Sequence, residues 1–164
     1  MTFRHLLLAA TTTLLAAPSL AAAQSPLVEK NLSMAMAQSI VIAAIEECGK
    51  SNYKVSVVVV DRAGQTAAAL RGDGTSPATV EFARMKAYTA RVRNQTSLEF
   101  MTATESADRQ ALRQIPGVVA IGGGVPIRVG SETIGGIGVS GAPGGDKDEI
   151  CAKAGLAKVA ASLN

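Results

Sequence analysis

Four basic residues in the middle of the chain have the side chains best suited to bind an anion. Arg84, Lys86, Arg91 and Arg93 lie within ten residues, with no acid among them. On a helix, Arg84 and Arg91 would share one face, whereas Lys86 and Arg93 would share another close to Phe82. Because the four residues do not form one stripe along the helix, the pattern does not indicate a helix that binds in a nucleic-acid groove. We interpret Arg84 and Arg91 as solvated charges.

Lys86 differs from its neighbours because it lies beside the apolar face of the expected helix. A cation in that position predicts a partly buried anionic partner, since an unpaired charge is costly to remove from water. The carboxylate of Asp61, of Asp73 or of a bound ligand would meet this requirement.

Two other motifs have structural explanations that we favour over functional ones. The acids Asp146, Asp148 and Glu149 would suit a hard cation, but the first turn of a helix attracts acids anyway. We expect a capping box formed by Asp146 and Glu149. The stretch Gly136–Gly141 matches G-x-G-x-x-G, yet it lies late in the chain and largely within an expected strand. Glycines there indicate close backbone approach, or the wall of a pocket, rather than a dinucleotide site.

Residues 1–23 have the pattern of a cleaved secretory signal peptide. Arg4 precedes the apolar run Leu6–Ala17, and Ala21–Ala23 supply small residues for cleavage before Gln24. The run is shorter than the ~20 apolar residues of a membrane anchor. Cleavage removes His5, the only histidine. The mature chain then excludes Ser-His-Asp and Cys-His catalysis and every metal site that needs histidine.

Length and composition fit one mature domain, residues 24–164. The leader predicts that this domain lies in the periplasm or outside the cell. The net charge of +3 is dilute and the chain has no Trp, which together argue against a nucleic-acid partner. Cys48 and Cys151 both survive cleavage. Two cysteines in an oxidising compartment pair more often than they stay free, so we expect a disulfide, with two buried thiols as the alternative.

The hydrophobic pattern predicts an α+β fold with a largely antiparallel sheet. Apolar spacing indicates helices from a cap at Asn31 or Ser33 to Gly49, from a cap at Ser76 to about Arg93, over Ser97–Gln114 and over Lys147–Ala161. β-Branched runs between turn residues indicate five strands, at Val55–Val60, Gln65–Arg71, Val118–Ile121, Val125–Val129 and Thr133–Ser140. The connections between strands are too short for parallel crossovers.

With these elements in order, the chain from about residue 30 to about residue 160 resembles a heme-binding family, also called heme-degrading. The family includes glycolate-operon G-type proteins, a secreted heme-binding sensor protein and the carboxy-terminal domain of propanediol-utilisation cobalamin adenosyltransferases. The resemblance rests on six segments in the same order: Val57–Gly64, Leu70–Gly74, Arg84–Ala90, Gly123–Ile127, Gly136–Gly141 and Asp148–Leu156.

The resemblance implies a five-stranded antiparallel sheet flanked by helices, assembly into homo-oligomers and binding of heme or a similar tetrapyrrole. It also implies a Cys48–Cys151 disulfide, as in secreted members. For this chain, the resemblance implies three kinds of binding residue: cations for the heme propionates, iron ligands other than histidine, and residues whose backbone forms the pocket wall. The candidates are Arg84, Lys86, Tyr88, Thr89, Gly123, Pro126 and Gly138. Tyr88 is the candidate axial ligand.

Three hypotheses about function follow. The first is a secreted or periplasmic protein that binds heme or a related small carboxylated ligand without strong catalysis. The second is an enzyme acting on a small anionic metabolite, with Asp61, Asp73 or Lys86 as general base. A carboxylate beside Lys86 in a cleft would favour this hypothesis. The third is a structural protein whose glycine-rich strands only pack subunits, which a broad apolar surface without a pocket would favour.

Overall fold

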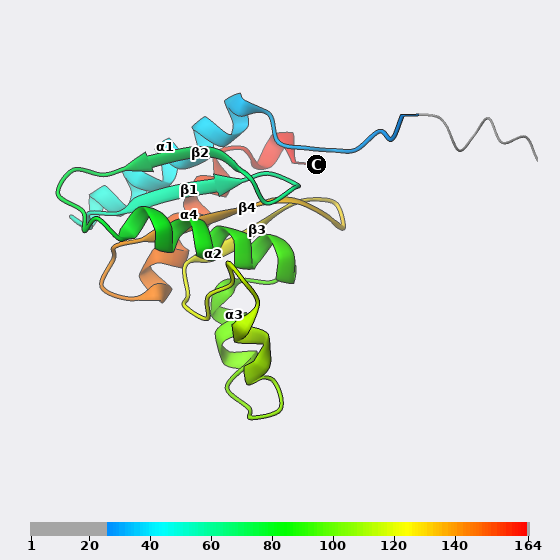
Figure 1. Ribbon diagram of the computed structural model, residues 1–164. Helices are drawn as coiled ribbons and strands as arrows, with labels where there is room; N and C mark the ends of the chain where they lie inside the picture. Colours follow the sequence, from blue (N-terminus) through cyan, green and yellow to red (C-terminus); the bar gives the residue numbers. More distant parts are fainter. Residues whose placement is uncertain (1–25, 164) are drawn as a thin grey trace, which may run out of the picture.

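A four-stranded antiparallel sheet forms the centre of the protein (Figure 1). The computed structural model describes residues 26–163, and the leader predicted at residues 1–23 lies outside the described residues. The strands are β1 (Ser56–Val60), β2 (Thr66–Arg71), β3 (Gly124–Val129) and β4 (Glu132–Ser140), in the order β2-β1-β4-β3. All three pairings are antiparallel, so the predicted α+β class is confirmed.

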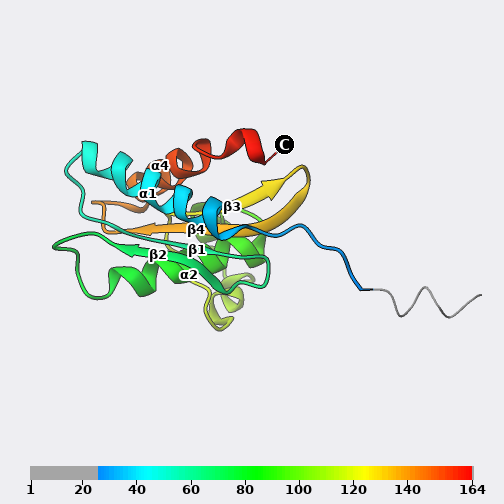
Figure 2. The ribbon, with the colours of Figure 1, turned by 90° about the horizontal axis from the view of Figure 1, so that it is seen from above.

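Helices cover both faces of the sheet, as Figure 2 shows from above. α1 (Met34–Lys50) and α4 (Gly145–Ala157) pack on one face, and α2 (Thr79–Arg93) packs on the other. A short helix, α3 (Ser97–Ala103), and a 3-10 turn at Gln110–Gln114 follow α2. Among residues 26–163, no helix combines the length and apolar character that a bilayer crossing requires.

β1 is buried on both sides because every residue in it is apolar except Ser56. Val57 and Val59 belong to the larger core, which lies under α1 and α4. Val58 and Val60 belong to a smaller cluster with Ala83 and Ala87 of α2. This alternation is what the two-residue period of a strand between two helical layers requires.

Glycines in β4 let α2 approach the sheet closely. A Cβ atom at Gly138 would collide with the carbonyl oxygen of Ala83, and one at Gly136 would collide with that of Ala87. Gly124 of the neighbouring strand faces the carbonyl oxygen of Lys86 in the same way. The G-x-G pattern is therefore explained by close packing between helix and sheet.

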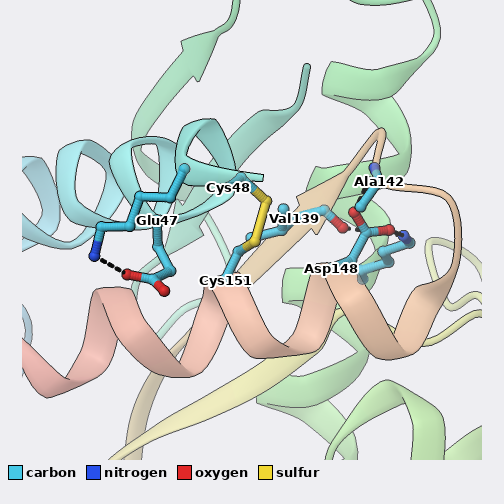
Figure 3. The surroundings of a disulfide bond; sticks show 8 residues. Glu47, Cys48, Val139, Ala142, Asp148 and Cys151 are labelled. Atoms are coloured by element: carbon cyan, nitrogen blue, oxygen red, sulfur yellow. Dashed lines mark hydrogen bonds and ion pairs between the residues drawn. A yellow bond between two sulfur atoms is a disulfide. The ribbon is translucent and has the colours of Figure 1, made fainter. Parts of the chain in front are cut away.

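A disulfide joins the last turn of α1 to α4, between the two cysteines that the sequence predicted to pair (Figure 3). The Cα atoms of Cys48 and Cys151 lie 5.5 Å apart, and the bond closes a loop with a sequence separation of 103. In the chain-entropy model, a loop of this length stabilises the folded state by about 4–5 kcal/mol.

The prediction of a five-stranded sheet is wrong, because Val118–Ile121 does not form a strand. The segment crosses the side of α2, where the Val119 amide donates a hydrogen bond to Oγ1 of Thr89 at 2.9 Å. Gly123, just before β3, has φ +115°, which turns the chain sharply before the sheet begins. The β-branched run is thus held by a helix side chain instead of a neighbouring strand.

Several predicted helix boundaries also need correction. α2 begins at Thr79 rather than beside Ser76, and the stretch predicted as one helix over Ser97–Gln114 splits into α3 and the 3-10 turn. The expected capping box at Asp146 is absent, since α4 is capped by Gly144 without a side-chain hydrogen bond. A capping box does form at α3, where Thr96 and Glu99 exchange side-chain and backbone hydrogen bonds.

The close packing of α2 predicts that Gly138→Ala is strongly destabilising. The added methyl group must displace the α2 backbone, and we expect a loss of about 3 kcal/mol in the free energy of unfolding, measured with urea. Gly49→Ala is the matched control, because a Cβ there meets nothing within 4 Å. That control lies within α1 and should stabilise the protein by about 0.5–1 kcal/mol. An unchanged urea midpoint for Gly138→Ala would contradict the packing argument.

Candidate functional site

A buried ion pair links α2 to the first turn of α4. Nζ of Lys86 lies 2.7 Å from Oδ2 of Asp148, and it also donates to the carbonyl oxygen of Val139 in β4 at 3.0 Å. Oδ1 of Asp148 accepts from the Ala142 amide at 2.9 Å, as Figure 3 shows. The two side chains are only 3% and 4% exposed. The pair thus connects α2, the end of β4 and the loop before α4.

Burial raises the pKa of the Asp148 carboxyl above its ordinary value. The Lys86 ammonium and the Ala142 amide lower this pKa and oppose the effect of burial only in part, while the nearby charge of Asp146 raises it further. Removing the carboxylate and the ammonium group from water costs free energy. Each charge is tolerated in the interior only because its partner is present.

Gly123 makes room for this ion pair. A Cβ atom at Gly123 would lie 2.6 Å from Cβ of Asp148 and 3.1 Å from Nζ of Lys86. The carbonyl oxygen of Gly123 accepts from the Val139 amide at 3.0 Å, which holds the glycine at the end of the sheet. Lys86 and Gly123, both candidate binding residues from the sequence, therefore lie together.

An open cleft of about 350 Å³ lies beside the ion pair. Lys86 and Asp148 line its inner part, and the partly exposed side chains of Phe82 and Ile121 form apolar walls. Thr79 and the residues from Ser140 to Gly145 complete the lining. Its volume falls within the usual range for small-molecule sites.

The start of α4 gives one side of the cleft hydrogen-bond donors. Gly144 caps the helix without a side chain, so the first backbone amides of α4 have no capping partner. Such amides and the helix dipole favour an anion. Lys147 lies 3.5 Å from Asp146, so the two exposed charges of this turn offset each other. The cleft thus combines apolar walls with donors suited to a carboxylate.

Tyr88 and Thr89 lie outside this cleft. The Tyr88 ring packs between two turns, with its carbon atoms about 3 Å from where Cβ atoms of Gly64 and Gly117 would stand. Thr89 is buried, and its hydroxyl donates to the Met85 carbonyl at 2.8 Å while accepting from the Val119 amide. Thr89 therefore holds the loop before β3 against α2.

The remaining candidate residues are also apart from the cleft. Arg84 forms an exposed ion pair with Glu81, at 2.8 Å. Pro126 lies in the edge strand β3 opposite Gly136, and Gly138 lies beneath α2. Of the candidate binding residues, only Lys86 lines the cleft; Gly123 lies against the ion pair behind it, and the structure places the others elsewhere.

The sequence missed the partner of Lys86. We expected Asp61, Asp73 or a ligand, and the structure places Asp148 there, 62 residues away along the chain. The sequence pattern at Asp148 indicates only an ordinary acid at a helix start. Its only sequence signal was its place among three acids, and that signal does not distinguish a capping residue from a buried ion partner. Within residues 26–163, no three His, Cys, Asp or Glu side chains are arranged to hold a metal ion.

The ion pair predicts a marked non-additivity between two substitutions. Lys86→Met or Asp148→Leu alone leaves one buried group unpaired and should cost about 3–5 kcal/mol in the free energy of unfolding. The double variant removes both groups and should recover at least half of that loss in urea titrations. Arg84→Met with Glu81→Leu is the control on the same helix, where the exposed pair should cost less than about 1 kcal/mol. A double variant as unstable as the worse single variant would count against the pair.

The chain is similar in sequence to proteins of a described family. A family model described as "Haem degrading protein HbpS-like" matches residues 32–157. Protein GlcG of Escherichia coli K12 is 33% identical over 109 residues, which cover 66% of this chain and 81% of GlcG.

Two solved structures are similar over most of their length. A crystal structure of an HbpS double mutant from Streptomyces reticuli is 36% identical, with a TM-score of 0.78, and the match covers 90% of this chain and 97% of that chain. A structure of a PduOC–heme complex shares the fold at 24% identity and a TM-score of 0.70, covering 77% of this chain and 94% of that one. By the match of its fold and of most of its sequence, the chain belongs to the HbpS-like family.

Proposed function

We propose that this protein binds heme, or a related carboxylated ligand, in the cleft beside the Lys86–Asp148 pair, without strong catalysis. The family description names heme, and a protein of the same fold has been crystallised with heme. The observation that carries the proposal is the cleft itself, which Phe82 and Ile121 line together with the start of α4, where no side chain caps the helix. An apolar ring edge with a carboxylate matches those two surfaces.

The residues of the cleft fit the periphery of a heme better than its iron. The side-chain types that commonly ligate heme iron are His, Cys, Met and Tyr, and the cleft lining includes none of them. Its single amine, Lys86, is already paired with Asp148. Bound heme would supply a redox-active iron. The part of this chain would be to hold the ring edge and the propionates through apolar contact and backbone amides.

Tyr88, the candidate axial ligand, belongs to an alternative site outside the cleft, in which this chain would ligate the iron. Lys86 and Tyr88 are two residues apart on α2 and point in different directions, since that spacing turns a helix by about 200°. An iron atom bound by Tyr88 would therefore lie at a second position, near the turns of Gly64 and Gly117. A ligand held in the cleft should bind with or without its iron, whereas a ligand held through Tyr88 should bind only when it contains iron.

We further propose that the protein works in the periplasm or outside the cell, as a homo-oligomer. The leader pattern at residues 1–23 supports export, and the Cys48–Cys151 disulfide suits an oxidising compartment.

Mass spectrometry of the exported protein should find Gln24 at its amino terminus.

Titration with hemin and with iron-free protoporphyrin IX tests the site. If the cleft holds the ring edge and propionates, both ligands bind saturably with dissociation constants within about threefold of each other, followed by the Soret band. Phe82→Asp should then weaken both about tenfold or more, because it places a negative charge on the apolar wall beside the ligand carboxylates. Tyr88→Phe should leave both unchanged.

Val92→Asp is the matched control, since Val92 is 40% exposed, Phe82 is 41% exposed, and both belong to α2. Their separation of ten positions corresponds to about 15 Å of helix. Loss of hemin binding alone in Tyr88→Phe would move the site to Tyr88. Saturable binding of neither ligand, or equal effects of the two Asp variants, would refute the proposal.

An enzyme acting on a small anionic metabolite is the second candidate, because a carboxylate does lie beside Lys86 at the cleft. Burial raises the pKa of the Asp148 carboxyl, which makes its carboxylate a stronger base than an ordinary one. We therefore expect that such an enzyme would exchange C–H for C–D in glycolate, lactate or pyruvate dissolved in D₂O. Exchange seen by NMR with the native protein and lost in Asp148→Asn would support it. No exchange of any of the three acids would remove this candidate.

A further inference from the structure

We propose that Ser140 is a ligand-binding residue whose hydroxyl group, with the first amides of α4, holds the carboxylate of a small apolar acid in the cleft. Ser140 is the last residue of β4 and lines the cleft. It is only 7% exposed, yet its hydroxyl forms no hydrogen bond within residues 26–163. In that part of the chain, the side-chain polar atoms sealed off without a partner are Nε of Arg93 and Oε2 of Glu149. The Ser140 hydroxyl is not among them, so it retains an opening to the cleft.

The neighbouring hydroxyl groups are already bonded within the protein. Ser56 lies opposite Ser140 in the pairing of β1 with β4, and its hydroxyl lies 2.7 Å from Oγ1 of Thr79. Thr79 donates its own proton to the carbonyl oxygen of Ser76 at 2.8 Å, so Ser56 is the donor to Thr79. Residues directly opposite on paired strands share a face, which places Ser140 beside this chain of bonds. A buried hydroxyl without a partner costs free energy, and a ligand in the cleft would remove that cost.

The first turn of α4 supplies further donors next to Ser140. The first backbone hydrogen bond of this helix runs from the Asp148 amide to the Gly144 carbonyl, at 3.0 Å. The amides of residues 145–147 therefore have no partner in the helix. Gly145 packs directly on Gly122, since a Cβ atom at Gly145 would lie 2.8 Å from the Gly122 Cα atom. This contact holds the donors of the turn in place.

The charges around the cleft favour a single carboxylate over a phosphate group. The ammonium of Lys86 and the carboxylate of Asp148 form a pair that is neutral as a whole. The remaining donors are a hydroxyl and backbone amides at a helix start, which suit one negative charge. A phosphate group carries more charge and is usually held by arginine side chains, which the cleft lining does not include.

The size of the cleft points to a small acid. A volume of about 350 Å³ admits such a molecule whole, with its apolar body against Phe82 and Ile121, whereas a porphyrin would enter with one edge. A porphyrin propionate and a small acid present the same carboxylate. The inference therefore rests on the cleft of the proposed function and does not require heme.

Titration of the native protein with benzoate, followed by backbone amide shifts in NMR spectra, tests the subsite. We expect saturable shifts at residues 140–146. Benzamide, which has the same ring without the charge, should cause none at equal concentrations. Ser140→Ala should weaken benzoate binding about tenfold or more, because a hydrogen bond to a charged group is lost. The same variant should leave the urea midpoint unchanged, because the hydroxyl has no partner within the described chain.

Ser56→Ala is the matched control, since Ser56 is a buried serine on the same face and does not line the cleft. It should lower the urea midpoint by removing a buried hydrogen bond, and it should leave benzoate binding unchanged. The inference is overturned if the native protein does not bind benzoate saturably, or if Ser140→Ala binds benzoate as tightly as the native protein does.

Protoporphyrin IX and its dimethyl ester separate this inference from the proposed function. If a propionate occupies the subsite, the native protein binds the free acid more tightly than the ester, and Ser140→Ala removes that difference. Binding of benzoate without binding of either porphyrin would refute the heme proposal and support the subsite. Binding of the free porphyrin without any binding of benzoate would support the heme proposal and overturn the subsite.

Discussion

The Lys86 ammonium lies out of water at the point where α2, the end of β4 and the loop before α4 meet, and Asp148 is the carboxylate that neutralises it. Each partner comes from a different layer of the fold. The ion pair therefore fixes how the start of α4 stands over α2, and the cleft is the space left beside that contact. Gly123 belongs to the same arrangement, because any side chain there would meet both partners.

The position of Lys86 also depends on the close packing of α2 on the sheet. Glycines at positions 124, 136 and 138 bring the helix backbone against the strands, so that Lys86 reaches the Val139 carbonyl and Asp148 with its side chain inside the protein. On the far side of the sheet, the Cys48–Cys151 disulfide ties α4 to α1 one helical turn beyond Asp148. α4 is thus held on both sides of its first turns, which gives the cleft a fixed wall.

Local patterns predicted most elements, and tertiary contacts decided the rest. The valine run of β1, the hairpin to β2 and the Ser33 cap of α1 are readable from the sequence because their signals lie within a few residues. Val118–Ile121 has the composition of a strand, but its amide is taken by Thr89, 30 residues away. Lys86 could be recognised as a buried cation from its helix face. Its partner Asp148 could not, because an acid at a helix start looks the same in either role.

The family match shows a heme-related protein, and we propose from the cleft that this chain holds the ligand's ring edge and carboxylates rather than its iron. The most direct test of this account is an NMR map of backbone amide shifts as iron-free protoporphyrin IX is added. The account predicts that the largest changes occur around Phe82, Ile121 and the loop from Gly141 to Gly145. Changes centred instead on Tyr88, Gly64 and Gly117 would contradict it.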